Sequence, residues 1–283
     1  MSSARPPVRV VVFGRHSADW MQALEPAAPV WKLMPEVAAV TLLDEAEPPP
    51  VAAAFGDEPP VLIPLMDAHA KARPWGFREF APSPATVDIL ANKRRFADYV
   101  KRSRLGVFAP ATFERLEDVR FPVVLKRADL SAGFGIVVVR DRRQMDQLLA
   151  SSDWQGADYV LQEFVDDQIE FVTHCVCRAG AILWSCTMLY ELFSDSPIRG
   201  TVPLRAVRQV GTPGHVLRQI EEFLLPLGYT GPCNVDYKLR ASGEICVLEI
   251  NPRLGGSLMM PRNVQLLRES LGVIIENAAI SGA

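Results

Sequence analysis

Short runs of β-branched and aliphatic residues alternate with polar stretches over the first third of the chain. Residues 8–14 (VRVVVFG) form such a run and end in glycine, which predicts a buried parallel strand at the start of an α/β domain. Further strands are predicted over residues 37–43 and 61–65, and the Pro/Ala-rich acidic stretch 45–60 between them predicts a connecting loop. The first strand is followed by RHSAD, which supplies no further glycine and so argues against a dinucleotide-binding fingerprint.

The middle of the chain begins at a PSP boundary, residues 82–84. A helical periodicity covers residues 85–104 and carries three basic residues near its middle. After it we predict three strands, over residues 121–126, 136–139 and 159–165. A helix is predicted over residues 144–150, between the second and third of these strands. The small residues between the first two of these strands predict a turn.

The last part of the chain predicts two antiparallel hairpins. The first covers residues 170–188 with its turn at Ala179-Gly180, and the second joins residues 234–239 to 244–250 through an Ala-Ser-Gly turn. The remaining segments are a polar, Arg-rich connection and two helices, predicted over residues 194–211, 215–227 and 264–279.

The composition is that of a globular protein of two domains, or of one large domain with subdomains. Apolar residues make up 49% of the 283 residues, and the net charge of −3 with scattered Lys and Arg predicts no nucleic-acid partner. No apolar run approaches the ~18 residues of a membrane span. The short apolar stretch 8–13 is interrupted by Arg9, so we expect no membrane partner and a cytoplasmic location. The five cysteines include no C-x-x-C pair, which predicts buried free thiols.

The stretch VLEINPRLGGS, residues 247–257, carries a dense cluster of candidate ligands. Glu249 and Asn251 are two apart on a predicted strand and so share a face, which Asp236 on the partner strand can join. Two carboxylates and an amide suit Mg²⁺ ions that bridge a nucleotide. Solvated residues flanking an ordinary hairpin would give the same local pattern. The exit from the strand favours a site, because Arg253 adds a cation where negative charge could develop and two glycines allow close approach.

Three other stretches could bind a nucleotide. Lys126 ends a strand and precedes the turn SAGFG, whose backbone N–H groups could meet phosphate oxygens. An ordinary hairpin turn has the same composition, and the Walker A spacing is absent. The strand end QEFVDDQIE could pair its backbone edge with adenine while Glu170 holds ribose hydroxyls, or it could form an acidic surface loop. Lys93, in the stretch ANKRR, could reach a phosphate or belong to a solvated helix face.

Taken in this order, these stretches resemble the ATP-grasp superfamily over about residues 85–260, and the metal-binding hairpin is similar to that of its carbamoyl-phosphate-synthetase and carboxylase branch. The resemblance implies a mixed α/β and α+β fold with three parts. These are an N-terminal Rossmann-like domain over residues 1–85, a small lobe over 86–158 and a larger, metal-binding lobe over 159–283. ATP would be enclosed between the two lobes.

The resemblance also implies a role for each matching residue. Lys93 and Lys126 would bind phosphates, and Lys126 and Arg253 would act in catalysis, with Arg253 steadying an acyl phosphate. The other nucleotide contacts would be Ser131, Gly133 and Gly135 in a mobile phosphate loop, Glu163, Phe164 and Val165 at adenine, and Glu170 at ribose. Asp236, Glu249 and Asn251 would ligate two Mg²⁺ ions, for which Mn²⁺ could substitute.

The implied activity is that of an ADP-forming ligase that activates a small carboxylate, such as an amino acid or a related acid, and couples it to an amine. A small-molecule kinase of the same fold and a nucleotide-binding regulatory module are the alternatives, and a homodimer is expected by analogy. Many peptide-forming members carry Arg two residues before the metal-binding Asp, where this chain has Asn234. Arg253 or an arginine of the 194–211 connection would then supply that charge, or the acceptor differs. Substrate contacts are expected from Arg199, Arg205, Arg208, Gly255, Gly256 and Ser257.

Overall fold

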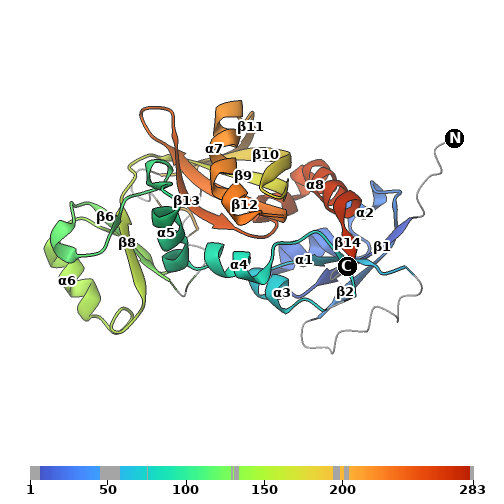
Figure 1. Ribbon diagram of the computed structural model, residues 1–283, viewed down its shortest axis with the longest axis horizontal. Coiled ribbons are helices and arrows are strands. Elements are labelled where there is room, and N and C mark those ends of the chain that lie inside the picture. The colour runs from blue at the N-terminus through green and yellow to red at the C-terminus, as the bar shows by residue number, and fades with distance from the viewer. Residues whose placement is uncertain are drawn as a thin grey trace.

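The computed structural model has an elongated shape built around three β-sheets (Figure 1). It describes residues 7–44, 58–74, 76–128, 130, 134–193, 198–200 and 204–280. Most of the predicted loop 45–60 and the predicted phosphate-loop residues Ser131 and Gly133 therefore lie outside the described residues. Among the helices of the described segments, none is both long enough and apolar enough to cross a bilayer.

The first sheet contains the three predicted N-terminal strands, which pair in parallel with β1 at the centre. β1 is buried on both faces, as its unbroken β-branched run predicts. The strands and helices of this part are β1 Val8–Phe13, α1 Ala18–Leu24, α2 Pro29–Lys32, β2 Val37–Leu43, β3 Val61–Pro64, α3 Asp67–Ala72 and β4 Arg78–Glu79. The loops that follow the carboxyl ends of β1 and β3 lead to His16 and Asp67.

The helical segment predicted over residues 85–104 is two helices, α4 (Pro84–Leu90) and α5 (Lys93–Arg102). The prediction of one helix was wrong because the first helix ends at Leu90, with Ala91 as its C-cap, and Asn92 caps the second. Its side-chain oxygen accepts the backbone N–H groups of Arg94 and Arg95, a bond that favours Asn at an N-cap. Lys93 is thereby placed at the first position of a helix.

The second sheet is antiparallel, in the order β5-β8-β6-β7, and α6 covers one of its faces. Its elements are β5 Thr112–Phe113, β6 Val123–Arg127, β7 Ile136–Val139, α6 Arg142–Ala150 and β8 Tyr159–Glu163. Lys126 lies near the end of β6, and Phe164 follows β8 directly. The predicted strands are therefore confirmed, while residues 129 and 131–133 of the predicted turn lie outside the described residues.

The third sheet is antiparallel, in the order β11-β10-β9-β12-β13. Its elements are β9 Ile169–Arg178, β10 Ala181–Glu191, β11 Ala206–Val210, α7 Gly214–Leu224, β12 Gly231–Leu239 and β13 Ile245–Asn251. Both predicted hairpins are present. The Arg-rich connection 194–211 was expected to lack regular structure, but its end forms β11, which extends the sheet by pairing with β10.

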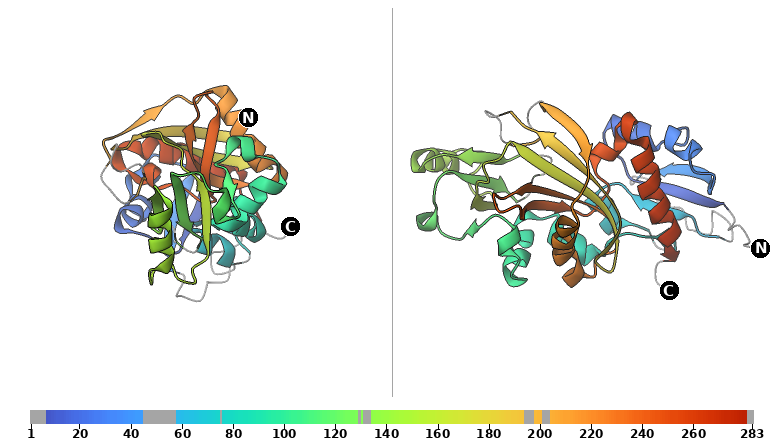
Figure 2. Two further views of the ribbon diagram at one scale, coloured as in Figure 1. Left: turned by 90° about the vertical axis from the view of Figure 1, so that its left-hand side faces the viewer. Right: turned by 90° about the horizontal axis from the view of Figure 1, so that it is seen from above.

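The C-terminal segment joins the first and third sheets. Helix α8 (Val264–Asn277) contacts α2 and β4 on one side and β9, β10 and β12 on the other, and β14 (Ala279–Ile280) then pairs with β4 (Figure 2). Short 3-10 helices complete the description, at Gly106–Phe108, Leu116–Asp118, Leu225–Leu227, Gly256–Met259 and Pro261–Asn263. The division near residues 85 and 158 stays a prediction.

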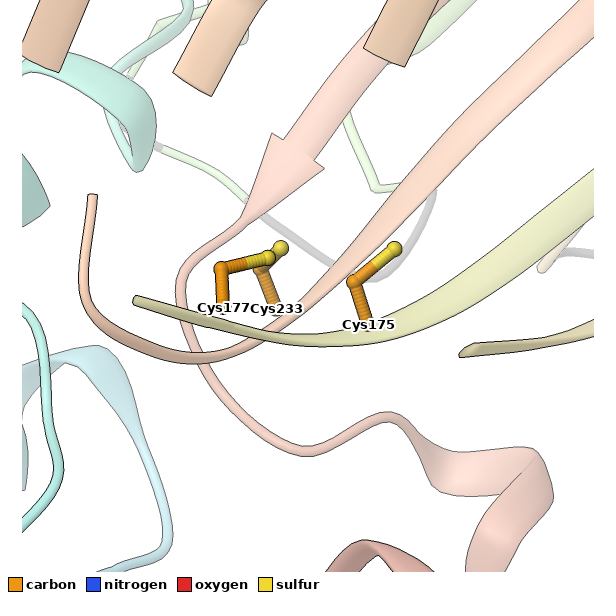
Figure 3. A group of neighbouring side chains, drawn as sticks. All are labelled: Cys175, Cys177 and Cys233. Carbon is orange, nitrogen blue, oxygen red and sulfur yellow. The ribbon is translucent and has the colours of Figure 1, made fainter. Parts of the chain in front are cut away.

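All five cysteines are free and buried, which confirms the prediction of buried free thiols. Three of them, Cys175 and Cys177 on β9 and Cys233 on β12, point to the same side of the sheet (Figure 3), and their sulfur atoms lie within 4.8 Å of one another. They belong to an apolar cluster that includes Phe223 and Val235. These surroundings favour packing as the role of the three thiols.

Candidate active site

The hairpin β12–β13 brings the predicted metal ligands together. Asp236 lies opposite Glu249 and Asn234 lies opposite Asn251, so all four residues share one face of the sheet. The Asn251 amide donates to Glu249 Oε1 at 3.1 Å and to Asn234 Oδ1 at 3.3 Å. The convergence that the two-residue spacing predicted is present.

The donor set fits a hard cation. Asp236 is 3% exposed, and its Oδ1 is buried without a hydrogen-bond partner among the described residues. Burial raises the pKa of this carboxyl, Arg199 opposes the rise, and the neighbouring Glu249 and Glu170 add to it. Desolvation alone would raise the pKa of Glu249, but the Asn251 amide and the Lys126 ammonium group hold it below its ordinary value. An unpaired carboxylate oxygen beside a second carboxylate and an amide is the oxygen-rich set that Mg²⁺ or Mn²⁺ prefers.

Arg199 occupies the space between two of the predicted site residues. Its Nε donates to Glu170 Oε1 at 2.5 Å, and its terminal nitrogen donates to Asp236 Oδ2. The guanidinium also lies 4.8 Å from the centre of the Tyr190 ring. Expected to contact substrate, Arg199 is here paired with the predicted ribose and metal carboxylates. The other two candidate arginines, Arg205 and Arg208, are exposed and do not line the cavity. Arg208 Nε lies 3.9 Å from Glu191 Oε1.

Two lysines approach the same face from the second sheet and α5. Lys126 acts electrostatically on Glu249, and burial lowers its pKa. Lys93 lies close enough to act on both groups, and its ammonium donates to the carbonyl of Leu130. Gly135, the described glycine of the predicted phosphate loop, has a φ of 65°, so its turn favours glycine whatever the loop binds.

The end of β8 forms the predicted adenine side. The Glu163 carboxylate pairs with Arg240 at 2.8 Å, and the Glu163 backbone N–H donates to the Ala111 carbonyl. Neither the carboxylate nor the N–H group of Glu163 is therefore free to meet a base. Phe164 and Val165 follow it along the cavity wall. Lys238, which the sequence analysis missed, donates to the Val165 carbonyl at 3.2 Å and lies 6.0 Å from the centre of the Phe164 ring. Its position two residues after Asp236 on β12 was the signal that could have found it.

The segment after β13 meets the N-terminal domain. Arg253 Nε lies 3.7 Å from Asp67 Oδ1, and the guanidinium lies 6.0 Å from the centre of the Trp20 ring. Burial raises the pKa of Asp67, and Arg253 opposes the rise. Asp67 and Trp20 could not be predicted as site residues from the sequence, because neither belongs to a motif.

The three small residues expected to contact substrate divide between two tasks. Gly256 lines the cavity. Ser257 is buried and its Oγ lies 2.6 Å from His174 Nε2, while a Cβ on Gly255 would lie 2.2 Å from His174 Cε1. Burial, with a smaller contribution from Arg199, lowers the pKa of His174 to about 3, so this imidazole is neutral. Gly255 and Ser257 therefore pack and bond to a buried histidine.

One cavity of about 400 Å³ joins most of these residues. It extends from the strand end at Phe164, past Lys126 and Asp236, to Trp20 of the N-terminal domain. Its polar and aromatic lining comprises His16, Trp20, Lys126, Glu163, Phe164, Glu170, Arg199, Asn234, Asp236, Lys238, Glu249, Asn251 and Arg253. Lys93 lines a smaller neighbouring pocket that shares Lys126, Glu249 and Asn251.

Comparison with solved structures finds the same fold in several known proteins. Solved structures with the same fold include the D-alanine–D-alanine ligase of Bacillus anthracis complexed with ATP, at 15% identity, with 96% of this chain and 97% of that one covered and a TM-score of 0.59. An L-amino acid ligase of Bacillus licheniformis matches at 16% identity, 98% and 76% coverage and a TM-score of 0.60. The N5-carboxyaminoimidazole synthetase of Staphylococcus aureus complexed with ADP matches at 10% identity, 91% and 73% coverage and a TM-score of 0.62.

A search of curated proteins gave no match. The family model of the ATP-grasp domain matches residues 90–257, more than half of the chain, and these residues include both predicted phosphate lysines and the metal hairpin. The mixed α/β fold and the family predicted from the motifs are both confirmed, and the chain belongs to the ATP-grasp family.

Proposed function

We propose that this protein is an ATP-dependent, ADP-forming ligase that activates a small carboxylate as an acyl phosphate and couples it to an amine. The observation that carries the proposal is the convergence of Lys126, Asp236, Glu249, Asn251 and Arg253 on one cavity. Two cations and three oxygen-bearing side chains therefore line the same cavity. Such an arrangement serves phosphoryl transfer, in which catalysis is mainly positioning and charge stabilisation.

The nucleotide would lie along the cavity from Phe164 toward the hairpin. Phe164 and Val165 would contact adenine, Lys238 would hold this strand end in place, and Glu170 would meet the ribose. Lys93 and Lys126 would neutralise phosphate oxygens. Asp236, Glu249 and Asn251 would hold one or two Mg²⁺ ions, which supply further charge neutralisation at the phosphates when bound.

Arg199 gives the site two arrangements. Without a bound cation its guanidinium balances Glu170 and Asp236. Asp236 can serve a metal only when Arg199 releases it, because the two cations would compete for one carboxylate. The released guanidinium would still lie beside the cavity, where it could meet a phosphate or a substrate carboxylate.

The acid substrate would bind beyond the metal side, with Arg253 at its carboxylate. One carboxylate oxygen would attack the γ-phosphorus in line, ADP would leave, and the acyl phosphate would remain. The amine would then attack the acyl carbon, lose a proton and release phosphate. Arg253 would stabilise the negative charge that develops in both steps.

A hydroxylamine trap tests this proposal. The protein would be incubated with ATP, Mg²⁺, hydroxylamine and pools of small carboxylic and amino acids, and the products identified by mass spectrometry. Acyl hydroxamate together with ADP is the expected result. A stable phosphorylated acceptor would favour the kinase alternative, AMP would contradict an acyl phosphate, and ATP binding without turnover over broad pools would favour a binding module.

A further inference from the structure

The cavity continues past the hairpin to a wall built by the N-terminal domain. His16 lies in the connection between β1 and α1, and Trp20 lies on α1. Both line the cavity together with Arg253 and Gly256. No motif drew attention to either residue, and the proposed chemistry gives neither of them a role.

This wall is flat and firmly held. The rings of His16 and Trp20 are stacked, with centroids 4.3 Å apart and an interplanar angle of 21°. Trp20 is 3% exposed and packs within the core cluster that contains Leu258 and Met259. A Cβ added at Gly256 would meet the indole at ordinary contact distance, 3.5 Å from Trp20 Nε1. The stack therefore offers a rigid aromatic surface at the end of the cavity.

The imidazole of His16 is suited to stacking. Burial lowers its pKa and Arg253 lowers it further, while Asp19 opposes the shift, so the net effect favours the uncharged ring. The four carboxylates of the cavity wall lie toward the nucleotide side, where Glu163 pairs with Arg240 while Glu170 and Asp236 pair with Arg199. The fourth, Glu249, accepts the Asn251 amide. At the His16–Trp20 end, the described residues thus offer an aromatic face and a cation, Arg253, whose Nε lies 3.7 Å from the Asp67 carboxylate.

The cation is Arg253, which the protein holds through a 3.7 Å ion pair with Asp67 and through long hydrogen bonds. Its terminal nitrogens make long hydrogen bonds, 3.2 Å to the Leu254 carbonyl and 3.5 Å to Asn251 Oδ1. Its Nε and the facing Asp67 Oδ1 are both buried without a hydrogen bond among the described residues. A guanidinium in this state gains two charge-assisted hydrogen bonds when a carboxylate arrives.

We propose that the acid substrate carries a planar aromatic group next to its carboxylate, with the carboxylate on Arg253 and the ring against His16 and Trp20. The inference rests on the proposed function for the identity of the substrate as an acid, and it adds the substrate class. The shared chemistry is an aryl group joined to a carboxylate, whether in an aromatic carboxylic acid or in an aromatic amino acid.

Two matched pairs of probes test this subsite by direct binding. Benzoate is compared with cyclohexanecarboxylate, and L-phenylalanine with L-cyclohexylalanine, by calorimetry or ligand-observed NMR with Mg²⁺ and ADP present. The planar member of at least one pair is expected to bind about threefold to tenfold more tightly than its saturated counterpart, the range of aromatic stacking. The pair that shows the difference identifies the source. Equal binding within both pairs, or no binding of either planar acid, overturns the proposal.

Variants of the half-exposed His16 locate the preference. His16→Ala should reduce the planar-over-saturated ratio toward one, and His16→Phe should keep it. His215→Ala, which removes an exposed histidine of α7, is the matched control and should leave the ratio unchanged. A ratio that survives His16→Ala contradicts the assignment of the wall.

Turnover measured on the same samples separates this proposal from the proposed function. Planar-selective binding without ADP or hydroxamate from any acid would leave the subsite standing and reject the ligase. Hydroxamate formed equally from planar and saturated acids would support the ligase and reject the aromatic subsite.

Discussion

His174 Nε2 lies 2.6 Å from Ser257 Oγ, and this contact ties the middle of the third sheet to the loop that carries Arg253. The loop has two further buried anchors. The Asn234 amide donates to the Arg253 carbonyl at 3.2 Å, and the Asn263 amide donates to the Ser257 carbonyl at 2.7 Å. Asn234, where many peptide-forming relatives place an arginine, therefore holds the backbone of the arginine that follows β13.

The burial of neutral His174 predicts a dependence of stability on pH. The pKa of its imidazole is about 3 in the folded protein and 6.5 for a solvated histidine, so between these pH values the unfolded chain binds more protons. The free energy of unfolding should therefore rise with pH across this window, by on the order of 1 kcal/mol per pH unit. As the pH falls from 6.5 toward 3, the protein should lose this stability. Urea unfolding at pH 4.5, 5.5 and 7 measures the slope.

The control for this prediction is a pair of histidine variants. His174→Gln keeps a polar side chain and should flatten the slope, while His215→Ala at an exposed site should retain it. An unchanged slope in His174→Gln would assign the acid sensitivity to other groups.

Arg199 should stabilise the protein most when no metal is bound. Arg199→Ala leaves Glu170 and Asp236 without their counter-ion, and we expect a loss of about 1–3 kcal/mol, less than for a fully buried pair because the side chain is 27% exposed. With Mg²⁺ and ADP present the loss should shrink, since a bound cation replaces the guanidinium. Thermal unfolding with and without ligand tests this, with Arg205→Ala as the exposed control. Equal losses in both conditions would contradict the exchange.

Glu249→Gln should abolish turnover without unfolding the protein. The substitution preserves the shape of the side chain but removes the negative charge beside Asp236 and Lys126. We expect at least about a hundredfold fall in ADP formation, in line with the loss of one charged group at a phosphoryl-transfer site. Glu114→Gln removes an exposed carboxylate just after β5 and is the control. Near-normal ADP release by a folded Glu249→Gln protein would reject the metal assignment.

Lys238 should act on nucleotide binding more than on chemistry. Its ammonium donates to the carbonyls of Val165 at 3.2 Å and Asp167 at 2.7 Å, which fixes the strand end proposed to meet adenine. Lys238→Met should raise the KM for ATP about tenfold, the scale of one charged hydrogen bond, while kcat changes little. Lys101→Met, at an exposed surface pair, is the control. A fall in kcat at constant KM would place Lys238 in the chemical step instead.

The parts of the site that could be predicted from the sequence are those set by local geometry. Asp236, Glu249 and Asn251 lie on strands joined by a short turn, so a period of two and the pairing of a hairpin suffice to bring them together. The β-branched run of β1 and the turn after Lys126 are local in the same sense. Lys238 lies two residues after Asp236 on β12, so the same alternation predicts that it shares the face of the metal ligands.

The remaining site residues depend on contacts between distant segments. His16, Trp20 and Asp67 meet Arg253 across more than 180 positions of sequence, and no spacing rule connects them. The pairing of Arg199 with both Glu170 and Asp236 similarly joins residues 29 and 37 positions apart, which no local spacing rule connects. The split at Asn92 was missed for a different reason, because helical periodicity continues across a residue whose side chain caps the next helix.

Gly255 and His174 offer a test of the loop packing that needs no substrate. Gly255 has an extended backbone, with φ −106° and ψ 148°, which alanine adopts readily, so only the lack of space opposes a side chain. A Cβ there would lie 2.2 Å from His174 Cε1, closer than packed atoms approach, and Gly255→Ala should cost about 1–3 kcal/mol of stability through overpacking. The neighbouring Gly256→Ala places its Cβ 3.5 Å from Trp20 and should cost much less.

The double variant Gly255→Ala/His174→Ala decides whether the clash is the cause. Removing the imidazole vacates the space that the new methyl group needs, so the second substitution should recover part of the loss, and the two changes should be non-additive. Urea unfolding of the four proteins of this cycle measures the coupling. Additive losses would mean that Gly255 is required for another reason, and the loop would then have to move independently of His174.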